Sequence, residues 1–311
     1  MENAINLKKS VWVMFYAGFI QSIKIFKYYL LPVLTVYSLY LLFKGEIASI
    51  DIYMFTIMFT LTQIGICLGY HRMESHKPFD PHPVVRFILL ALGAISLSGP
   101  PSYWVAIHLR HHAHADKDGD PHSPIHGFWH AHYAWINKLN LANLRDPYMK
   151  RFQGDTMLEF FDKTNLLWGL LGGVVPGVID GWHGFLWGFA VRVFCTTHTT
   201  WLVNSYGHCF GKRDYLTKDQ SRNNFWLAII SMGEGWHNNH HAFPKSAYHG
   251  FKWYQIDVCG YLVSMLEKLG LVKNVYRVSK ESKKNRKITE EASSIEEIAE
   301  VKAKETAEIT T

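Results

Sequence analysis

Apolar runs of near-membrane length divide this chain into spanning and polar parts. A helix needs about 20 predominantly apolar residues to cross the hydrocarbon core at 1.5 Å per residue. Runs at about 27–43, 52–70, 165–179 and 184–206 approach this length, and Asp180 to His183 forms a tight turn between the last two. The pattern therefore predicts an all-α integral membrane protein with four transmembrane helices.

Two further apolar segments are too short or too interrupted to span. Residues 11–25 contain Gln21 and Lys24, which is typical of an interfacial helix. Residues 84–98 are apolar apart from Arg86. If they crossed the bilayer, the histidines before and after them would lie on opposite faces, so we place this segment in or along the near face.

The polar parts of the chain are basic and rich in histidine. Under the positive-inside rule, residues 71–163 and 207–278 form a cytosolic helical cap on a membrane domain of residues 1–278. We expect a multi-pass protein with both termini in the cytosol, in a bacterial inner membrane or the endoplasmic reticulum, and no removable signal peptide. Residues 279–311 are charged and lack aromatic residues, which predicts a disordered tail or a frayed helix.

Composition limits the classes of binding partner that we expect. Aromatic residues make up 15% of the chain and fall largely in the apolar runs, which favours a membrane protein. The net charge is +6, but Lys and Arg flank apolar segments instead of forming a stripe, so anionic lipid headgroups are expected as partners and nucleic acid is not. The four cysteines form no C-x-x-C pair, which argues against a disulfide framework or a zinc ribbon.

Histidines at helical spacing are the main candidate chemistry. The segments 108–112 (HLRHH) and 237–241 (HNNHH) share the spacing H-x-x-H-H, which places three imidazoles on one side of a helix. Asn204 and His208 are one turn apart at the end of the fourth span. His71 and His76 are five residues apart, too wide for one face of a regular helix, so we expect the helix to end near Met73.

These side chains are too numerous for a single metal ion. One zinc takes about four ligands and an octahedral ion six, so nine imidazoles and one amide indicate two metals. An all-nitrogen set fits iron, copper or zinc, and the residues alone leave the metal open. His114 is expected to support the site without ligating, and five other histidines are expected to be structural or solvated, namely His82, His126, His183, His198 and His249.

The motifs HRMESH, HLRHH, HNNHH, N-S-x-x-H and G-E-G-W-H resemble those of the membrane fatty acyl desaturases of the stearoyl (Δ9) type, over roughly Tyr70 to Pro244. The resemblance implies two iron ions bound by nine histidines and a water held by an asparagine. It implies that one iron takes His71, His76, His108 and His112, with Asn204 holding its water. It implies that the other iron takes His111, His208, His237, His240 and His241.

The same resemblance implies an O2-dependent oxidoreductase that inserts a cis double bond into a saturated acyl chain on a lipid or CoA. Trp104, Thr196 and Trp201 are candidates for the wall of a closed apolar substrate tunnel. Because ligating histidines usually donate their second N–H to a carboxylate or carbonyl, acidic residues near the boxes are candidate supports. These are Glu234, Asp116, Asp118 and Asp120, with a solvated loop as the equal alternative for the three aspartates.

The partners follow from what the motifs contain and lack. Ala106 and Ile107 stand where animal acyl-CoA enzymes of this family carry an Arg-Asp pair, which favours acyl chains on glycerolipids. No His-Pro-Gly-Gly haem motif is present, so we expect electrons from a separate ferredoxin or cytochrome b5 and its reductase, attracted by the basic cytosolic face. The alternatives are a related membrane hydroxylase or monooxygenase and, from another class, a membrane metal or haem carrier.

Overall fold

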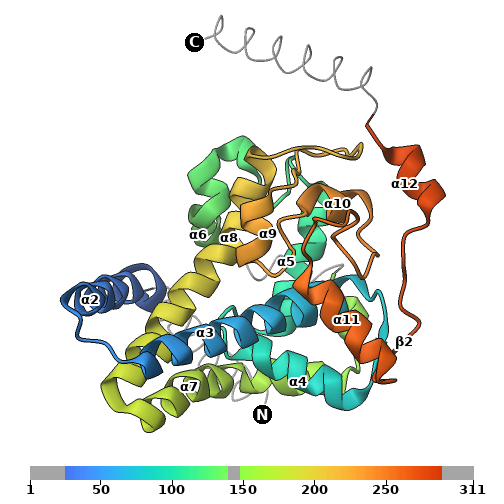
Figure 1. The fold of residues 1–311 in the computed structure, drawn as a ribbon. Helices are drawn as coiled ribbons and strands as arrows, with labels where there is room; N and C mark the ends of the chain where they lie inside the picture. The colour runs from blue at the N-terminus through green and yellow to red at the C-terminus, as the bar shows by residue number, and fades with distance from the viewer. Residues whose placement is uncertain (1–24, 139–147, 289–311) are drawn as a thin grey trace, which may run out of the picture.

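The structure, a computed structural model, describes residues 25–138 and 148–288 (Figure 1). The described residues are mostly helical, and their one sheet is a two-residue antiparallel pair in which Asp80 faces Lys273. In chain order the elements are η1 (Phe26–Leu30), α2 (Leu31–Lys44), α3 (Ser49–Ile64), η2 (Gly65–His76), β1 (Asp80–Pro81), α4 (Pro83–Ala94), α5 (Pro101–His114), η3 (Pro124–His126), η4 (His130–Ala134), α6 (Trp135–Lys138), η6 (Lys150–Phe152), α7 (Thr156–Phe185), η7 (Leu186–Val191), α8 (Arg192–Cys209), α9 (Phe225–Ile230), α10 (His237–Ala242), α11 (Val258–Lys268), β2 (Val272–Lys273) and α12 (Lys280–Arg286).

Two continuous helices of the described chain are long and apolar enough to cross a bilayer. They are Phe26–Lys44, which joins η1 to α2, and Ser49–His76, which joins α3 to η2. Large apolar side chains on them are exposed, for example Val33 at 63% and Phe43 at 89%. Exposure of this kind suits contact with lipid, because a lipid-facing surface need not be polar. The first two expected spans coincide with these helices, and the predicted interfacial helix at 11–25 lies almost wholly outside the described residues.

The third and fourth apolar runs form a helical hairpin. α7 leaves helical geometry at Asp180 and Gly181, where the expected turn lies, and the chain continues through η7 into α8. The buried Arg192 fastens the hairpin, because its guanidinium donates to the carbonyls of Gly188 at 3.1 Å, Gly172 at 2.9 Å and Ile95 at 2.6 Å. The last bond also ties the end of the α4 segment to the hairpin.

The largest hydrophobic core holds η2 in place. It joins buried side chains from η2, α4, α7 and α11, including Tyr70, Leu90 and Phe161. α4 has 12 residues, too short to span, and packs directly on η2. A Cβ at Gly69 would lie 2.8 Å from the Leu89 carbonyl oxygen, so glycine is what lets the two backbones approach.

The π-helical winding of η2 corrects one sequence prediction. The helix does not end near Met73 but continues to His76, and Lys77 terminates it in a left-handed conformation with φ 48°. The backbone hydrogen bonds of a π-helix join residues i and i+5, so residues five apart lie near the same face. The rings of His71 and His76 accordingly lie 5.1 Å apart.

The described start of the expected tail contains a short helix. Residues 279–288, here named the C-terminal strap, contain α12 and pair with the 214–216 segment through Leu216 N to Arg286 O at 2.8 Å and Ile288 N to Asp214 O at 3.0 Å. The side chains of α12 are not buried. The remaining residues of that tail, 289–311, lie outside the described ranges.

Candidate metal centre

Five imidazoles converge from three helices. His71 and His76 come from η2, His108 and His112 from α5, and His240 from α10, and their candidate ligand atoms lie within 4.8 Å of one another. The Nε2 atom of His240 is 3.0 Å from that of His71 and 2.9 Å from that of His112. The Nε2 atoms of His76 and His108 are 2.8 Å apart. All five rings therefore turn the same nitrogen toward a common point.

A second cluster of four imidazoles lies beside the first. It contains His111 from α5, His208 from α8, and His237 and His241 from α10. The Nε2 atoms of His208 and His237 are 3.0 Å apart, and those of His111 and His241 are 3.4 Å apart. Adjacent residues on a helix point about 100° apart. α5 can therefore supply His111 to one cluster and His112 to the other.

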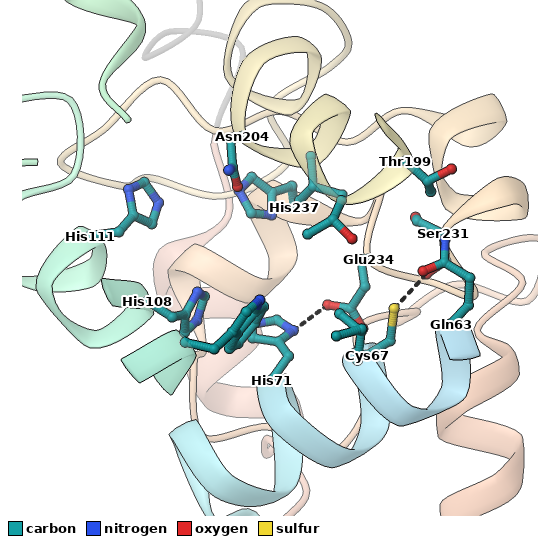
Figure 2. A pocket seen from close by; sticks show the side chains of 14 residues that line it. Gln63, Cys67, His71, His108, His111, Thr199, Asn204, Ser231, Glu234 and His237 are labelled. Carbon is teal, nitrogen blue, oxygen red and sulfur yellow. Dashed lines mark hydrogen bonds and ion pairs between the residues drawn. The ribbon is translucent and has the colours of Figure 1, made fainter. Parts of the chain in front are cut away.

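This arrangement corrects the expected division of ligands. His240 belongs with His71 and His112, not with His237 and His241. On α10, His237 and His241 are one turn apart and share a direction, whereas His240 points about 100° away from His241. Asn204 lies one turn before His208 on α8 and lines a cavity together with His237 and His111. In Figure 2 its amide stands next to the His237 ring.

Carboxylates accept from the outer nitrogen of four of these rings. The Nδ1 atoms of His111, His208 and His241 each lie 3.0 Å from a carboxylate oxygen, of Asp120, Asp116 and Asp219 respectively. His71 Nδ1 contacts Glu234 in the same way. Asp118, the fourth acid considered, is exposed. Asp219 escaped the sequence analysis because it stands 22 residues before His241, with no motif linking them.

The donor set fits a pair of metal ions. Burial, reinforced by neighbouring imidazoles, holds the pKa values of His108, His112, His237, His240 and His241 well below the usual range, so these rings are neutral. A ring that donates through Nδ1 to a carboxylate keeps a bare lone pair on Nε2. Lone pairs facing one another at about 3 Å in a buried site repel unless a cation lies between them. Each cluster thus has the chemistry of a metal site.

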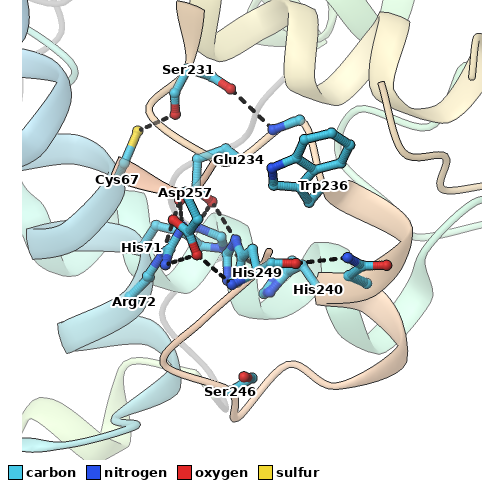
Figure 3. A network of polar contacts seen from close by, with 12 residues as sticks. Cys67, His71, Arg72, Ser231, Glu234, Trp236, His240, Ser246, His249 and Asp257 are labelled. Atoms are coloured by element: carbon cyan, nitrogen blue, oxygen red, sulfur yellow. Dashed lines mark hydrogen bonds and ion pairs between the residues drawn. The ribbon is translucent and has the colours of Figure 1, made fainter. Parts of the chain in front are cut away.

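A buried ion network packs against the first cluster (Figure 3). Arg72 is 0% exposed and donates to Glu234 at 2.9 and 3.0 Å, to Asp257 at 2.8 and 3.1 Å, and to the Ala247 carbonyl at 2.9 Å. Burial alone would raise the pKa of Glu234, but the interactions with His249, His71 and Arg72 outweigh it and hold that pKa well below its usual range. Glu234 is therefore an anion beside the His71 ring.

His249 is a site-adjacent residue that the sequence analysis did not find. It is fully buried, its Nδ1 lies 3.3 Å from Glu234 Oε2, and its ring lies 4.5 Å from that of His240. His114, in contrast, is exposed and outside both clusters. His249 stands alone in the sequence with no helical partner, so no spacing signal could have identified it.

Cavities lead from the clusters toward the outside. One of about 40 Å³ touches both clusters and is lined by Trp104, Thr199 and Thr200 among others (Figure 2). A second, of about 100 Å³, shares Trp104 and Thr200 and is also lined by Trp201 and Lys27. A third, of about 440 Å³, shares Trp201 and Lys27 and adds Tyr28, Tyr133 and His198. Because successive cavities share lining residues, the three lie next to one another.

The expected tunnel residues differ in their relation to these cavities. Trp104 and Trp201 line them, and Trp104 stacks on the His108 ring at 5.4 Å. Thr196 lines none of the three, although its side chain is fully buried. Its neighbour Thr197 and Thr200, one helical turn further on, do line the second cavity.

Fold and site together define a mostly helical, membrane-associated protein with a histidine-rich candidate metal centre. The model of the fatty acid desaturase family matches residues 51–259, and the chain belongs to this family of oxidoreductases. It is 38% identical over 213 residues to an sn-1 stearoyl-lipid 9-desaturase of Anabaena variabilis, covering 68% of this chain and 78% of that protein.

Two other relatives show how varied the substrates of similar proteins are. The chain is 37% identical over 262 residues to a hex-5-enoyl-(acyl-carrier protein) acetylenase of Moorena producens, covering 78% of this chain and 81% of that protein. It is 39% identical over 226 residues to a chloroplastic palmitoyl-monogalactosyldiacylglycerol delta-7 desaturase of Arabidopsis thaliana. That match covers 72% of this chain and 61% of the relative's length.

Proposed function

We propose that this protein inserts a cis double bond, at the Δ9 position, into a saturated acyl chain carried on a lipid, using O2, a di-iron centre and external electrons. The observation that carries the proposal is the convergence of nine imidazoles in two adjacent clusters beside an apolar cavity. In balanced form, a –CH2–CH2– unit, O2, two electrons and two protons give –CH=CH– and two waters.

We assign one iron to each cluster. One iron would take the five imidazoles of His71, His76, His108, His112 and His240, and the other the four of His111, His208, His237 and His241. The second set is one ligand shorter, and Asn204 stands one turn from His208, so we assign the asparagine-held water to this iron. Bound iron would supply the redox chemistry that reduces O2 and removes hydrogen from an unactivated methylene.

The protein's own side chains position the substrate and exclude water. Trp104, against the rings of His108 and His71, would fix the acyl chain beside the clusters, because an aromatic face is rigid and apolar. A small and mostly apolar cavity leaves little room for water around the reacting carbons. The carboxylates Asp116, Asp120, Asp219 and Glu234 would keep four of the ligand rings in one orientation.

The head group of the substrate would remain at the third cavity, the one that does not touch the histidine clusters. Lys27, Tyr28 and Tyr133 make the third cavity more polar than the first, which suits an ester or a headgroup oxygen. Ile107, which lines the second cavity, is apolar, so this position offers no charged group to a nucleotide. We therefore favour glycerolipid-borne chains over acyl-CoA, in keeping with the lipid substrates named for two of the relatives.

Four spans with a cytosolic cap are part of the proposal. The helices Phe26–Lys44 and Ser49–His76 support the first two spans, and the α7 to α8 hairpin has the geometry needed for the other two. In such an arrangement the histidines and both termini face the cytosol, with the protein in a bacterial inner membrane or the endoplasmic reticulum membrane. There a ferredoxin or cytochrome b5, with its reductase, would supply electrons.

Expression in a host that lacks monounsaturated lipids tests this function. We expect new monounsaturated chains, with their double-bond position and head group determined by mass spectrometry, and about two irons per purified chain. His240→Ala should abolish product, whereas His114→Ala, a change at an exposed histidine outside the clusters, should not. Saturated lipid profiles with a competent electron donor present would refute the proposal.

A further inference from the structure

The C-terminal strap brings positive charge to the face of the protein that covers α10. Four exposed cations lie on it, at Lys280, Lys284, Arg286 and Lys287. Three more exposed lysines lie in the segments that it contacts, at Lys212, Lys218 and Lys245. Among the described residues of these segments the one exposed acid is Glu281, since Asp214 is half-buried and paired with Lys252. We call the seven cations the strap face.

The strap is fastened to the helix that carries three candidate ligands. Asn238, between His237 and His240, accepts from the backbone N–H groups of Asp214 and Tyr215 at 2.8 Å each. The strap in turn pairs with this 214–216 segment. Hydrogen bonds thus join α10 to the strap through the 214–216 segment.

One strap residue, Arg286, contacts α10 without an intervening segment. The Arg286 guanidinium donates to the Ala242 carbonyl at 2.5 Å and lies over the Phe243 ring. Ala242 follows His241, whose ring belongs to the four-imidazole cluster. A short bonded path therefore joins a basic surface to a candidate ligand, and in Figure 1 α12 lies on the outside, at the end of the molecule away from α2.

We propose that the strap face is the docking surface for an acidic one-electron carrier protein, which delivers the two electrons of each turnover close to His241. This inference rests on the proposed function, because the balanced reaction needs external electrons. Charge complementarity selects the partner: seven exposed cations attract a negatively charged carrier and steer its encounter. The position of α12 at the end of the molecule opposite α2 (Figure 1) argues against lipid headgroups as the occupant.

Three lysines allow a clean test, since no side-chain contact holds Lys280, Lys284 or Lys287 among the described residues. The triple change of these residues to Glu is compared with a matched triple, Lys138→Glu, Lys268→Glu and Lys273→Glu, at exposed lysines outside the strap face. Full-length protein loaded with iron is assayed with a 2Fe–2S ferredoxin and with the haem domain of cytochrome b5, each over a range of carrier concentration and salt.

We expect the strap triple to raise the KM for the carrier about tenfold or more at low ionic strength and to flatten its salt dependence, because steering charges act mainly on association. The kcat at saturating carrier and the iron content should match those of the wild type, and the control triple should leave KM within about twofold. An unchanged KM in the strap triple, or an equal rise in the control, overturns the docking site.

Two other occupants give distinct results. If the strap triple loses binding to vesicles of phosphatidylglycerol while the carrier KM is unchanged, the face binds lipid and the proposal is wrong. Residues 289–311 contain seven glutamates and two lysines, so this segment could occupy the face itself. If replacing those glutamates with glutamine lowers the wild-type KM tenfold and the strap triple then has no effect, the segment and not the carrier is the occupant.

Direct binding separates this inference from the proposed function. Affinity of each carrier for immobilised protein is measured without turnover. If the wild type makes no unsaturated product but the strap triple still loses carrier affinity, docking stands and the desaturase proposal fails. If product forms and the affinity is unchanged in the triple, docking fails and the desaturase proposal stands.

Discussion

Replacing Asp219 with Asn tests whether the four-imidazole cluster is a metal site. Asp219 Oδ2 accepts from His241 Nδ1 at 3.0 Å, and Oδ1 accepts from the Ser221 backbone N–H at 3.0 Å. Asn is nearly the same size and can still accept the Ser221 bond, so the loop should persist. The change removes the negative charge that makes the His241 ring a better ligand and holds its orientation.

The expected magnitude follows from the role of such carboxylates. Loss of the hydrogen-bond partner of a ligating histidine typically weakens metal affinity 10- to 100-fold, or about 1.4 to 2.7 kcal/mol. Only the cluster containing His241 should weaken, since the nearest acid of the other cluster is Glu234. We therefore expect one of the two irons to be lost first when the variant is titrated with a chelator.

The assay is chelator competition followed by metal analysis of the retained protein. Asp118→Asn is the matched control, because Asp118 is exposed on the same acidic loop as Asp116 and Asp120. Two irons released together at wild-type chelator concentration in Asp219→Asn would refute the reasoning. Equal weakening in Asp118→Asn would show that net charge, not the His241 contact, sets the affinity.

Three further outcomes are expected. Arg72→Met leaves two buried carboxylates without their partner and should lower the free energy of unfolding by about 3 to 5 kcal/mol in chemical denaturation. The loss should be smaller, about 1 kcal/mol, for Arg110→Met, because the half-buried Arg110 loses one hydrogen bond, to the Gly119 carbonyl. A shift below about 1 kcal/mol for Arg72→Met would contradict the network. Trp201→Ala removes a side chain that lines both the second and the third cavity. It should change the distribution of desaturated chain lengths while the iron content is retained. An unaltered product profile by mass spectrometry would show that Trp201 does not line the substrate path. Burial lowers the pKa values of at least five clustered imidazoles, so below about pH 6.5 the unfolded metal-free chain binds more protons than the folded one. The Tm of the metal-free protein should therefore fall as the pH drops from about 7.5 to about 5.5. A Tm that does not change with pH would contradict neutral rings.

Local periodicity was sufficient for much of the candidate site. The spacing H-x-x-H-H gave the side of α5 and α10 on which the imidazoles lie, because neighbours within one helical turn have a fixed relative direction. The apolar runs gave the first two long helices and the turn at Asp180 and Gly181 in the same manner. Each of these features depends on residues close together in the chain.

The tertiary structure decided what each side chain meets. His240 joins His71 because the fold brings one end of η2 to α10, and the π-helical winding of η2 brings His76 to the same side. Asp219 and His249 have no spacing signal, since their partners come from other segments. The sequence alone thus determined the residue types and their faces, whereas contacts between distant segments set the division into two clusters, because helix geometry fixes direction within a turn and not which helices cross.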